Sequence, residues 1–191
     1  MTIRYLDIEM ILRVNSNASY LSKPKARIRA GGHYFLSNRP PDLTRAPNTN
    51  PTINGPIHTI SKIMSSVMSS ATESEIGATF INGQEAFPIS TTLAKLGNPH
   101  SDTPILVNNL TAEGFANNTI KQKRLKAIDI RFYWIQDRTQ KKQFRIYWKP
   151  GSTNLGDYHM KHHRSSHQRL MRSTYLHPVI QLADLVISHI L

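Results

Sequence analysis

The chain has 191 residues, a length that suits one domain with at most a short appendage. It contains no cysteine, which excludes disulfides and thiolate metal sites. A net charge of +12 favours a polyanionic partner over a merely solubilising surface, and nucleic acid is the commonest polyanion. Because the sequence has neither a signal-peptide stretch nor an apolar run long enough to span a bilayer, we expect an intracellular protein without membrane contact.

Three apolar segments near the N-terminus predict strands that pair as an antiparallel meander. They are residues 8–16, 26–37 and 57–63. The pair Gly31-Gly32 in the second segment predicts either a bulge or the close approach of another segment. Residues 38–56 are rich in proline and predict a long mobile loop.

The second half of the chain alternates between helical and strand patterns. The predicted elements are a helix over 69–84 that continues over 85–97 after a break near Pro88, a strand over 104–108, helices over 110–118 and 125–141, and a strand over 144–148. Ser69 or Ser70 is suited to cap the first helix, and Glu73 lies in its first turn. This order predicts a mixed α/β sheet with helices packed on it.

The C-terminal residues differ in composition from the rest. We expect residues 1–163 to form the domain and residues 164–191 to form a tail that is first basic and then apolar. Val179, Leu182 and Val186 fall on one face of a helix, which predicts docking on the body of the protein.

Four short motifs occur along the chain in a fixed order. They are NSNASY at 15–20, SSATESE at 69–75, PILVNN at 104–109 and NLGDY at 154–158. Together they resemble the ribonuclease H domain of copia-type retrotransposon polyproteins, over roughly residues 3 to 175. The resemblance implies an α/β ribonuclease H-like fold, with a mixed five-stranded sheet flanked by helices. It also implies a reverse-transcriptase context and Mg²⁺-dependent hydrolysis of the RNA strand in an RNA–DNA hybrid.

The resemblance places the catalytic positions at Asn17, Glu75, Asn108 and Asp157. Ribonuclease H holds two Mg²⁺ ions about 4 Å apart, and their mutual repulsion is offset by carboxylate ligands. Two of the four positions are asparagine here, and an amide oxygen brings no charge. Glu75 and Asp157 remain as anionic metal ligands. We therefore expect two-ion occupancy, and hence hydrolysis, to be lost or severely weakened.

Each of these side chains also has a simpler interpretation. Asn17 and Asn108 suit strand ends, Glu75 suits a solvated helix face, and Asp157 suits a helix cap. A second group of candidates is His159, His162, His163 and His167. Zinc accepts imidazole ligands, but the adjacent pair does not easily face one ion, so a basic, pH-sensitive segment that contacts phosphate is the preferred interpretation.

Positive charge is clustered in the C-terminal half. The candidate nucleic-acid-binding residues are Lys121, Lys123, Arg124, Arg138, Lys141, Lys142 and Lys161. Aromatic residues at 132–134 and 147–148 are interleaved with them and offer rings for stacking on bases or riboses. Aromatic residues on a helix and on the strand that follows it are more often part of the core, and this is the preferred interpretation. Three hypotheses remain open: an inactive domain that binds hybrid or duplex backbone weakly and without sequence preference, an active hybrid ribonuclease, and a relic without activity.

Overall fold

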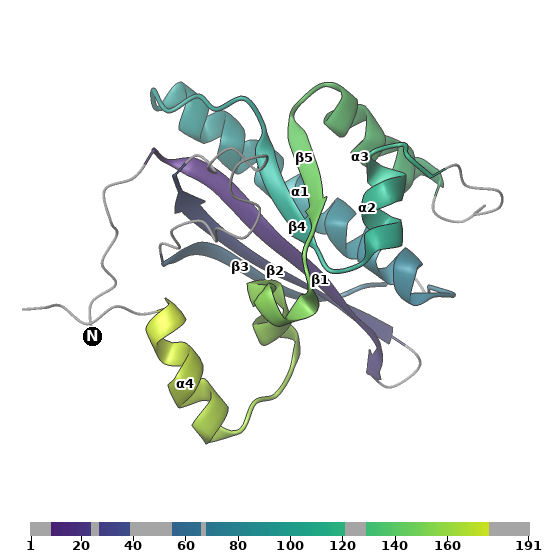
Figure 1. The fold of residues 1–191 in the computed structure, drawn as a ribbon, viewed down its shortest axis with the longest axis vertical. Helices are drawn as coiled ribbons and strands as arrows, with labels where there is room; N and C mark the ends of the chain where they lie inside the picture. The colour runs from purple at the N-terminus through teal and green to yellow at the C-terminus, as the bar shows by residue number, and fades with distance from the viewer. Residues whose placement is uncertain (1–8, 24–26, 39–54, 66–67, 121–128, 176–191) are drawn as a thin grey trace, which may run out of the picture.

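The computed structural model describes residues 9–23, 27–38, 55–65, 68–120 and 129–175. Five strands form one sheet in the order β3-β2-β1-β4-β5 (Figure 1). The strands are β1 (Ile11–Lys23), β2 (Arg27–Ser37), β3 (Pro56–Ile63), β4 (Thr103–Val107) and β5 (Phe144–Trp148). The first three pair antiparallel, whereas β4 pairs parallel with β1 and with β5. The predicted antiparallel meander followed by parallel strands is confirmed.

The first strand is longer than the sequence pattern indicates. It was expected to end at residue 16, but β1 continues to Lys23 and pairs with β2 as far as Lys23↔Arg27, with an irregularity after Ser19. Polar residues persist in this strand because the side chains of Ser16 and Asn17 find partners on neighbouring elements. The loop predicted over 38–56 and the apolar half of the tail lie largely outside the described residues.

Helix α1 (Ala71–Lys95) is continuous, so the expected break near Pro88 is wrong. Proline removes one backbone donor and leaves the carbonyl four residues earlier without its helical partner. Pro88 and Gln84 are both exposed, so the missing hydrogen bond falls on the solvent side of α1. At the N-terminus Ser70 is the cap, and its side chain accepts a hydrogen bond from the Glu73 amide.

The two faces of the sheet carry different elements. On one face, Asn82 of α1 contacts Ser16 of β1 and Tyr34 of β2. A Cβ added to Gly32 would meet Asn82 on that face, whereas a Cβ added to Gly31 would meet Met160 and the Gly156 carbonyl. The short helix η3 (Leu155–Met160) therefore covers the opposite face from α1. Of the two interpretations of Gly31-Gly32, close approach is confirmed, because the pairing register runs through both glycines without a bulge.

The remaining helices are α2 (Leu110–Ala116), α3 (Asp129–Gln140), η2 (Gly151–Thr153) and α4 (Ser165–Tyr175). Phe132 and Ile135 of α3 lie three residues apart, on one face of the helix, and both are buried in the core that α3 shares with α1. The expected start of that helix at residue 125 lies outside the described residues. Helix α4 projects from the lower edge of the molecule beyond η3 (Figure 1). Within the described ranges, no helix is both long and apolar enough to cross a bilayer.

Candidate metal and nucleic-acid site

The four positions suggested by the sequence meet at one place. Asn17 lies in β1, Glu75 in the second turn of α1, Asn108 directly after β4, and Asp157 in η3. β1 and β4 are parallel neighbours with Asn15 beside Leu106, and this register places Asn17, in the middle of β1, level with Asn108 just past the end of β4. The turn of η3 then lays Asp157 over this point from the opposite face to α1.

Asn17 is the centre of the hydrogen-bond network. Its Oδ1 accepts from the backbone amide of Ala18 at 2.8 Å and from Asn108 Nδ2 at 2.9 Å, while its Nδ2 donates to Asp157 Oδ1 at 3.0 Å. A backbone amide only donates, so this contact fixes which side-chain atom of Asn17 is oxygen. The amino group of Asn17 therefore faces Asp157.

Glu75 is the fourth member and is almost fully buried, at 5% exposure. Its Oε1 accepts from the Ala18 amide at 3.0 Å, and its Oε2 is buried without a hydrogen-bond partner among the described residues. The pKa of Glu75 is raised to about 8, mainly by burial and to a smaller extent by the nearby charge of Asp157, against the lowering effect of the Ala18 amide. Glu75 thus adds little negative charge to the site near neutral pH.

Besides Asn17, one side chain contacts the Asp157 carboxylate and another fixes the helix that carries it. Lys161, one helical turn later, places its Nζ 2.7 Å from Oδ1 and 2.8 Å from Oδ2. Asn154 fixes the position of η3: its Nδ2 donates to the Ser16 carbonyl at 2.7 Å, and its Oδ1 accepts from the Gly156 amide at 2.9 Å. The carboxylate of Asp157 is therefore positioned by the residue that precedes η3 and neutralised by the residue that follows it.

This arrangement does not fit a two-ion Mg²⁺ site. Within the described ranges, no group of three or more His, Asp or Glu side chains is placed to hold a metal. The Asn17 amino group points at the carboxylate oxygen that a metal would need, and the Lys161 ammonium supplies a positive charge at the same carboxylate. The unpartnered Oε2 of Glu75 is the one feature that suits an added ligand. The proximity of the four residues is an observation, and their catalytic role remains a prediction.

The basic candidates within the described residues differ in their surroundings. Arg138 is enclosed by the rings of Phe87 and Trp134, at 4.8 and 5.2 Å, and donates to Gln143. Lys141 forms an ion pair with Asp137 at 2.8 Å. Lys142 is exposed in the turn before β5. Lys121, Lys123 and Arg124 lie outside the described residues, so their role stays a prediction.

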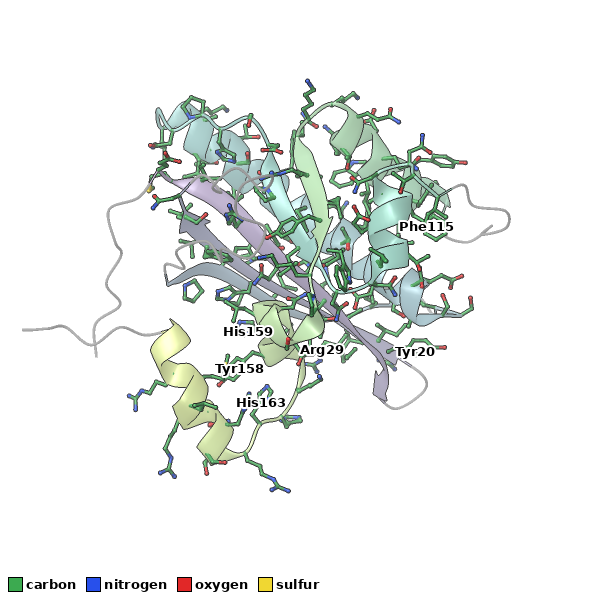
Figure 2. The ribbon with its side chains drawn as sticks, in the orientation of Figure 1. Tyr20, Arg29, Phe115, Tyr158, His159 and His163 are labelled. Carbon is green, nitrogen blue, oxygen red and sulfur yellow. The ribbon has the colours of Figure 1, made fainter. Side chains whose placement is uncertain are left out.

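Three of the four histidine candidates divide into two groups, and the fourth, His162, is exposed. His159 lies against buried His33 of β2, with His33 Nδ1 and His159 Nε2 3.3 Å apart. The ring of His163 stacks on Tyr158 (Figure 2), and His167 packs against both rings. Of the aromatics, Trp134 packs against the core, but Tyr133 and Trp148 are 62% and 42% exposed.

Comparison with solved structures identifies the architecture. The chain is similar to the N-terminal RNase H domain of Rv2228c from Mycobacterium tuberculosis, at 10% identity over 79% of this chain and 94% of that one, with a TM-score of 0.50. It is also similar to LC11-RNase H1, solved in complex with an RNA/DNA hybrid, at 11% identity over 77% and 91% of the two chains, with a TM-score of 0.53. The chain has the ribonuclease H-like fold.

The predicted fold class is therefore confirmed. The foamy virus RNase H domain also matches, at 16% identity over 78% of this chain and 88% of the viral domain, with a TM-score of 0.44. No protein-family model and no curated protein matches the sequence.

Asn82 is the site-supporting residue that the sequence analysis missed. It is fully buried in α1, and its Nδ2 donates to Ser16 Oγ at 2.9 Å and to the Gly31 carbonyl at 3.0 Å. Its Oδ1 accepts from the Tyr34 hydroxyl at 2.7 Å. Asn82 lies four residues from both Ala78 and Ala86, on the apolar side of the helix, and this spacing is the signal that could have identified it.

Proposed function

We propose that this protein is a retrotransposon-derived ribonuclease H-like domain whose hydrolytic centre is impaired and which retains weak, sequence-independent binding to RNA–DNA hybrid or duplex backbone. The retrotransposon origin is supported by the four motifs in their order and spacing. The nucleic-acid partner is supported by the charge of +12 and by the fold shared with a protein solved on a hybrid.

The observation that carries the impairment is the hydrogen bond from Asn17 Nδ2 to Asp157 Oδ1 at 3.0 Å. An aspartate at this position would bring two anionic oxygens together, and a divalent cation between them would offset their repulsion. Asparagine joins the same two positions without a metal. With Asn108 also neutral and Asp157 paired to Lys161, the site lacks the negative charge that two divalent ions require.

A cleavage assay separates the proposal from its enzymatic alternative. The wild-type protein and the Asn17→Asp/Asn108→Asp double variant are incubated with a labelled RNA–DNA hybrid in Mg²⁺ or Mn²⁺. We expect no cleavage above background for the wild type and metal-dependent cleavage for the double variant. Cleavage by the wild type at a rate equal to or above that of the double variant would contradict the impairment.

Salt-dependent binding tests the retained function against the relic hypothesis. Backbone contacts release counterions, so the logarithm of the affinity falls linearly with the logarithm of salt concentration, by about 0.9 per phosphate neutralised on duplex DNA. We expect a clearly negative slope, equivalent to several phosphates, for a blunt-ended hybrid. A slope near zero would contradict binding to the nucleic-acid backbone.

A further inference from the structure

Beyond the candidate site, two parallel rings form a stack, and a third ring packs against both of them. The ring of His163 is parallel to that of Tyr158, with centroids 4.6 Å apart and an interplanar angle of 5°. His167, in the first turn of α4, lies 4.5 Å from His163 at 28° and 6.1 Å from Tyr158 at 31°, so it contacts both rings. Figure 2 shows Tyr158 and His163 between η3 and α4, at the edge of the molecule.

The stack is fixed in place rather than loosely arranged. His163 Nε2 donates to the Tyr158 carbonyl at 2.9 Å, which sets the orientation of the central ring. Gln168 Nε2 donates to the His163 carbonyl at 3.2 Å, which ties the same segment to α4. Tyr158 follows Asp157 directly in the chain, so this ring of the stack and the candidate carboxylate are both carried by η3. Preorganised rings lose little conformational freedom when a further ring is added.

Exposure and charge indicate what this stack can receive. The side chain of His167 is exposed, and Arg164 and Arg169 are exposed cations on either side of it in the sequence. The segment from Tyr158 to Tyr175 contains four Lys and Arg residues, Lys161, Arg164, Arg169 and Arg172, and no Asp or Glu. Aromatic faces beside a track of cations match a polymer that alternates planar bases with phosphates.

We propose that the Tyr158–His163–His167 stack and the adjoining arginines of α4 form a binding site for single-stranded nucleic acid, with one base stacked on His167. This site extends the proposed function, on which it rests for the nature of the polymer, by adding a single-stranded extension to the duplex. Each phosphate of that extension lies in reach of the cations, and the base preference is general because every base has a planar face.

The test uses the full 191-residue chain and two fluorescent oligonucleotides of equal length and charge, an oligothymidylate of about 12 nucleotides and its abasic counterpart. The wild type is expected to bind the thymidylate about fivefold or more tightly than the abasic strand. His167→Leu, which covers the His163 face with a non-planar side chain, is expected to reduce this ratio to near one. His167→Tyr keeps a ring and is expected to keep the ratio.

Ser166→Leu is the matched control, because it makes a similar apolar change at the neighbouring exposed position of α4. It is expected to leave the ratio unchanged. Equal binding of the two strands by the wild type, or a ratio that survives in His167→Leu, would overturn the proposal. Blunt-ended hybrid is measured in parallel, because it presents no unpaired base. If the affinity for the hybrid does not depend on salt but the thymidylate is still bound more tightly than the abasic strand, the proposed duplex binding is wrong and the single-strand site stands.

Discussion

Asn108 donates its side-chain amide to Asn17 Oδ1 over 2.9 Å, and the Asn17 amide in turn donates to Asp157 Oδ1 over 3.0 Å. Side chains from β1, from the end of β4 and from η3 are thus joined by neutral or charge-assisted hydrogen bonds. Carboxylates at the same positions would repel one another unless a cation lay between them. The two amides therefore join these three elements by hydrogen bonds that require no cation between them.

The Asn17→Asp/Asn108→Asp double variant should be less stable than the wild type when divalent metal is removed. Three carboxylates would then lie at hydrogen-bonding distance with no donor between them, and we expect a loss of about 2–3 kcal/mol in EDTA. Added Mg²⁺ should recover part of this loss, because a ligand that binds only the folded state stabilises it. Thermal unfolding with and without metal measures both effects.

Asn118→Asp provides the control for that comparison, since Asn118 is exposed and lies outside the site. Its unfolding temperature should not depend on Mg²⁺. If the double variant is as stable as the wild type in EDTA, the amide network is not what holds these elements together.

Lys161→Gln should change stability little and metal affinity more. The ion pair with Asp157 is largely solvent-exposed, with side-chain exposures of 56% and 32%, so its contribution to folding is about 0–1 kcal/mol. Its removal leaves the Asp157 carboxylate without a competing cation. We expect Mn²⁺ to bind more tightly to the triple variant that adds Lys161→Gln to the two aspartate substitutions, as measured by calorimetry. An unchanged Mn²⁺ affinity would show that Lys161 does not compete.

Asn82→Ala should be strongly destabilising, by about 3 kcal/mol, because it removes hydrogen bonds from several buried groups. The Ser16 hydroxyl and the Gly31 carbonyl each lose a donor, and the Tyr34 hydroxyl loses the Oδ1 acceptor while keeping the Asn82 backbone carbonyl. Urea unfolding of the variant measures the loss. Gln84→Ala, an exposed change two residues along the same helix, should alter stability by less than about 0.5 kcal/mol. Equal effects of the two substitutions would argue against a structural role for the Asn82 network.

His33 should make the protein less stable in acid. The pKa of His33 is lowered from 6.5 to about 3, mainly by burial and to a smaller extent by the neighbouring His159. Between these two values the unfolded chain binds a proton that the folded chain does not. The contribution is therefore fully present above pH 6.5 and declines as the pH falls, by up to about 1.4 kcal/mol per pH unit.

His33→Gln removes this titration and should flatten the dependence of the unfolding free energy on pH between about 6.5 and 4. Because the carboxylates titrate in both proteins, the difference between the two pH curves isolates the histidine. Parallel curves would mean that His33 is not the group responsible. His159, whose pKa burial also lowers, contributes to the part that remains.

Gly31→Ala should displace η3 and with it Asp157. A Cβ at Gly31 would meet Met160 Cγ and lie 2.5 Å from the Gly156 carbonyl, so one side must move, at a cost of about 1–3 kcal/mol. Gly151→Ala is the matched control, because its Cβ would make an ordinary contact at 3.5 Å with Asn108. Urea unfolding should separate the two variants. If they lose equal stability, the close approach of η3 to β2 is not what requires glycine at position 31.

Much of the fold follows from local patterns. The strand β5 was predicted over the residues that form it, and β2, β3 and β4 within one residue at each end, because apolar runs bounded by turns specify strands directly. Two predictions failed. The strand β1 continues through polar residues because α1 and η3 supply their hydrogen-bond partners, which the local pattern does not contain. Helix α1 continues through Pro88, which is exposed on the helix together with Gln84.

The sequence by itself determined the chemical identity of the four candidate side chains: two amides and two carboxylates, in motifs whose order resembles a known family. Only the tertiary structure decided how these groups meet, and in particular that the Asn17 amino group faces Asp157 and that Lys161 neutralises the same carboxylate. The physical reason is that residue identity sets the charge a side chain can hold. Orientation and pairing depend instead on parallel strands and a returning turn that place residues distant in the chain within 3 Å of one another.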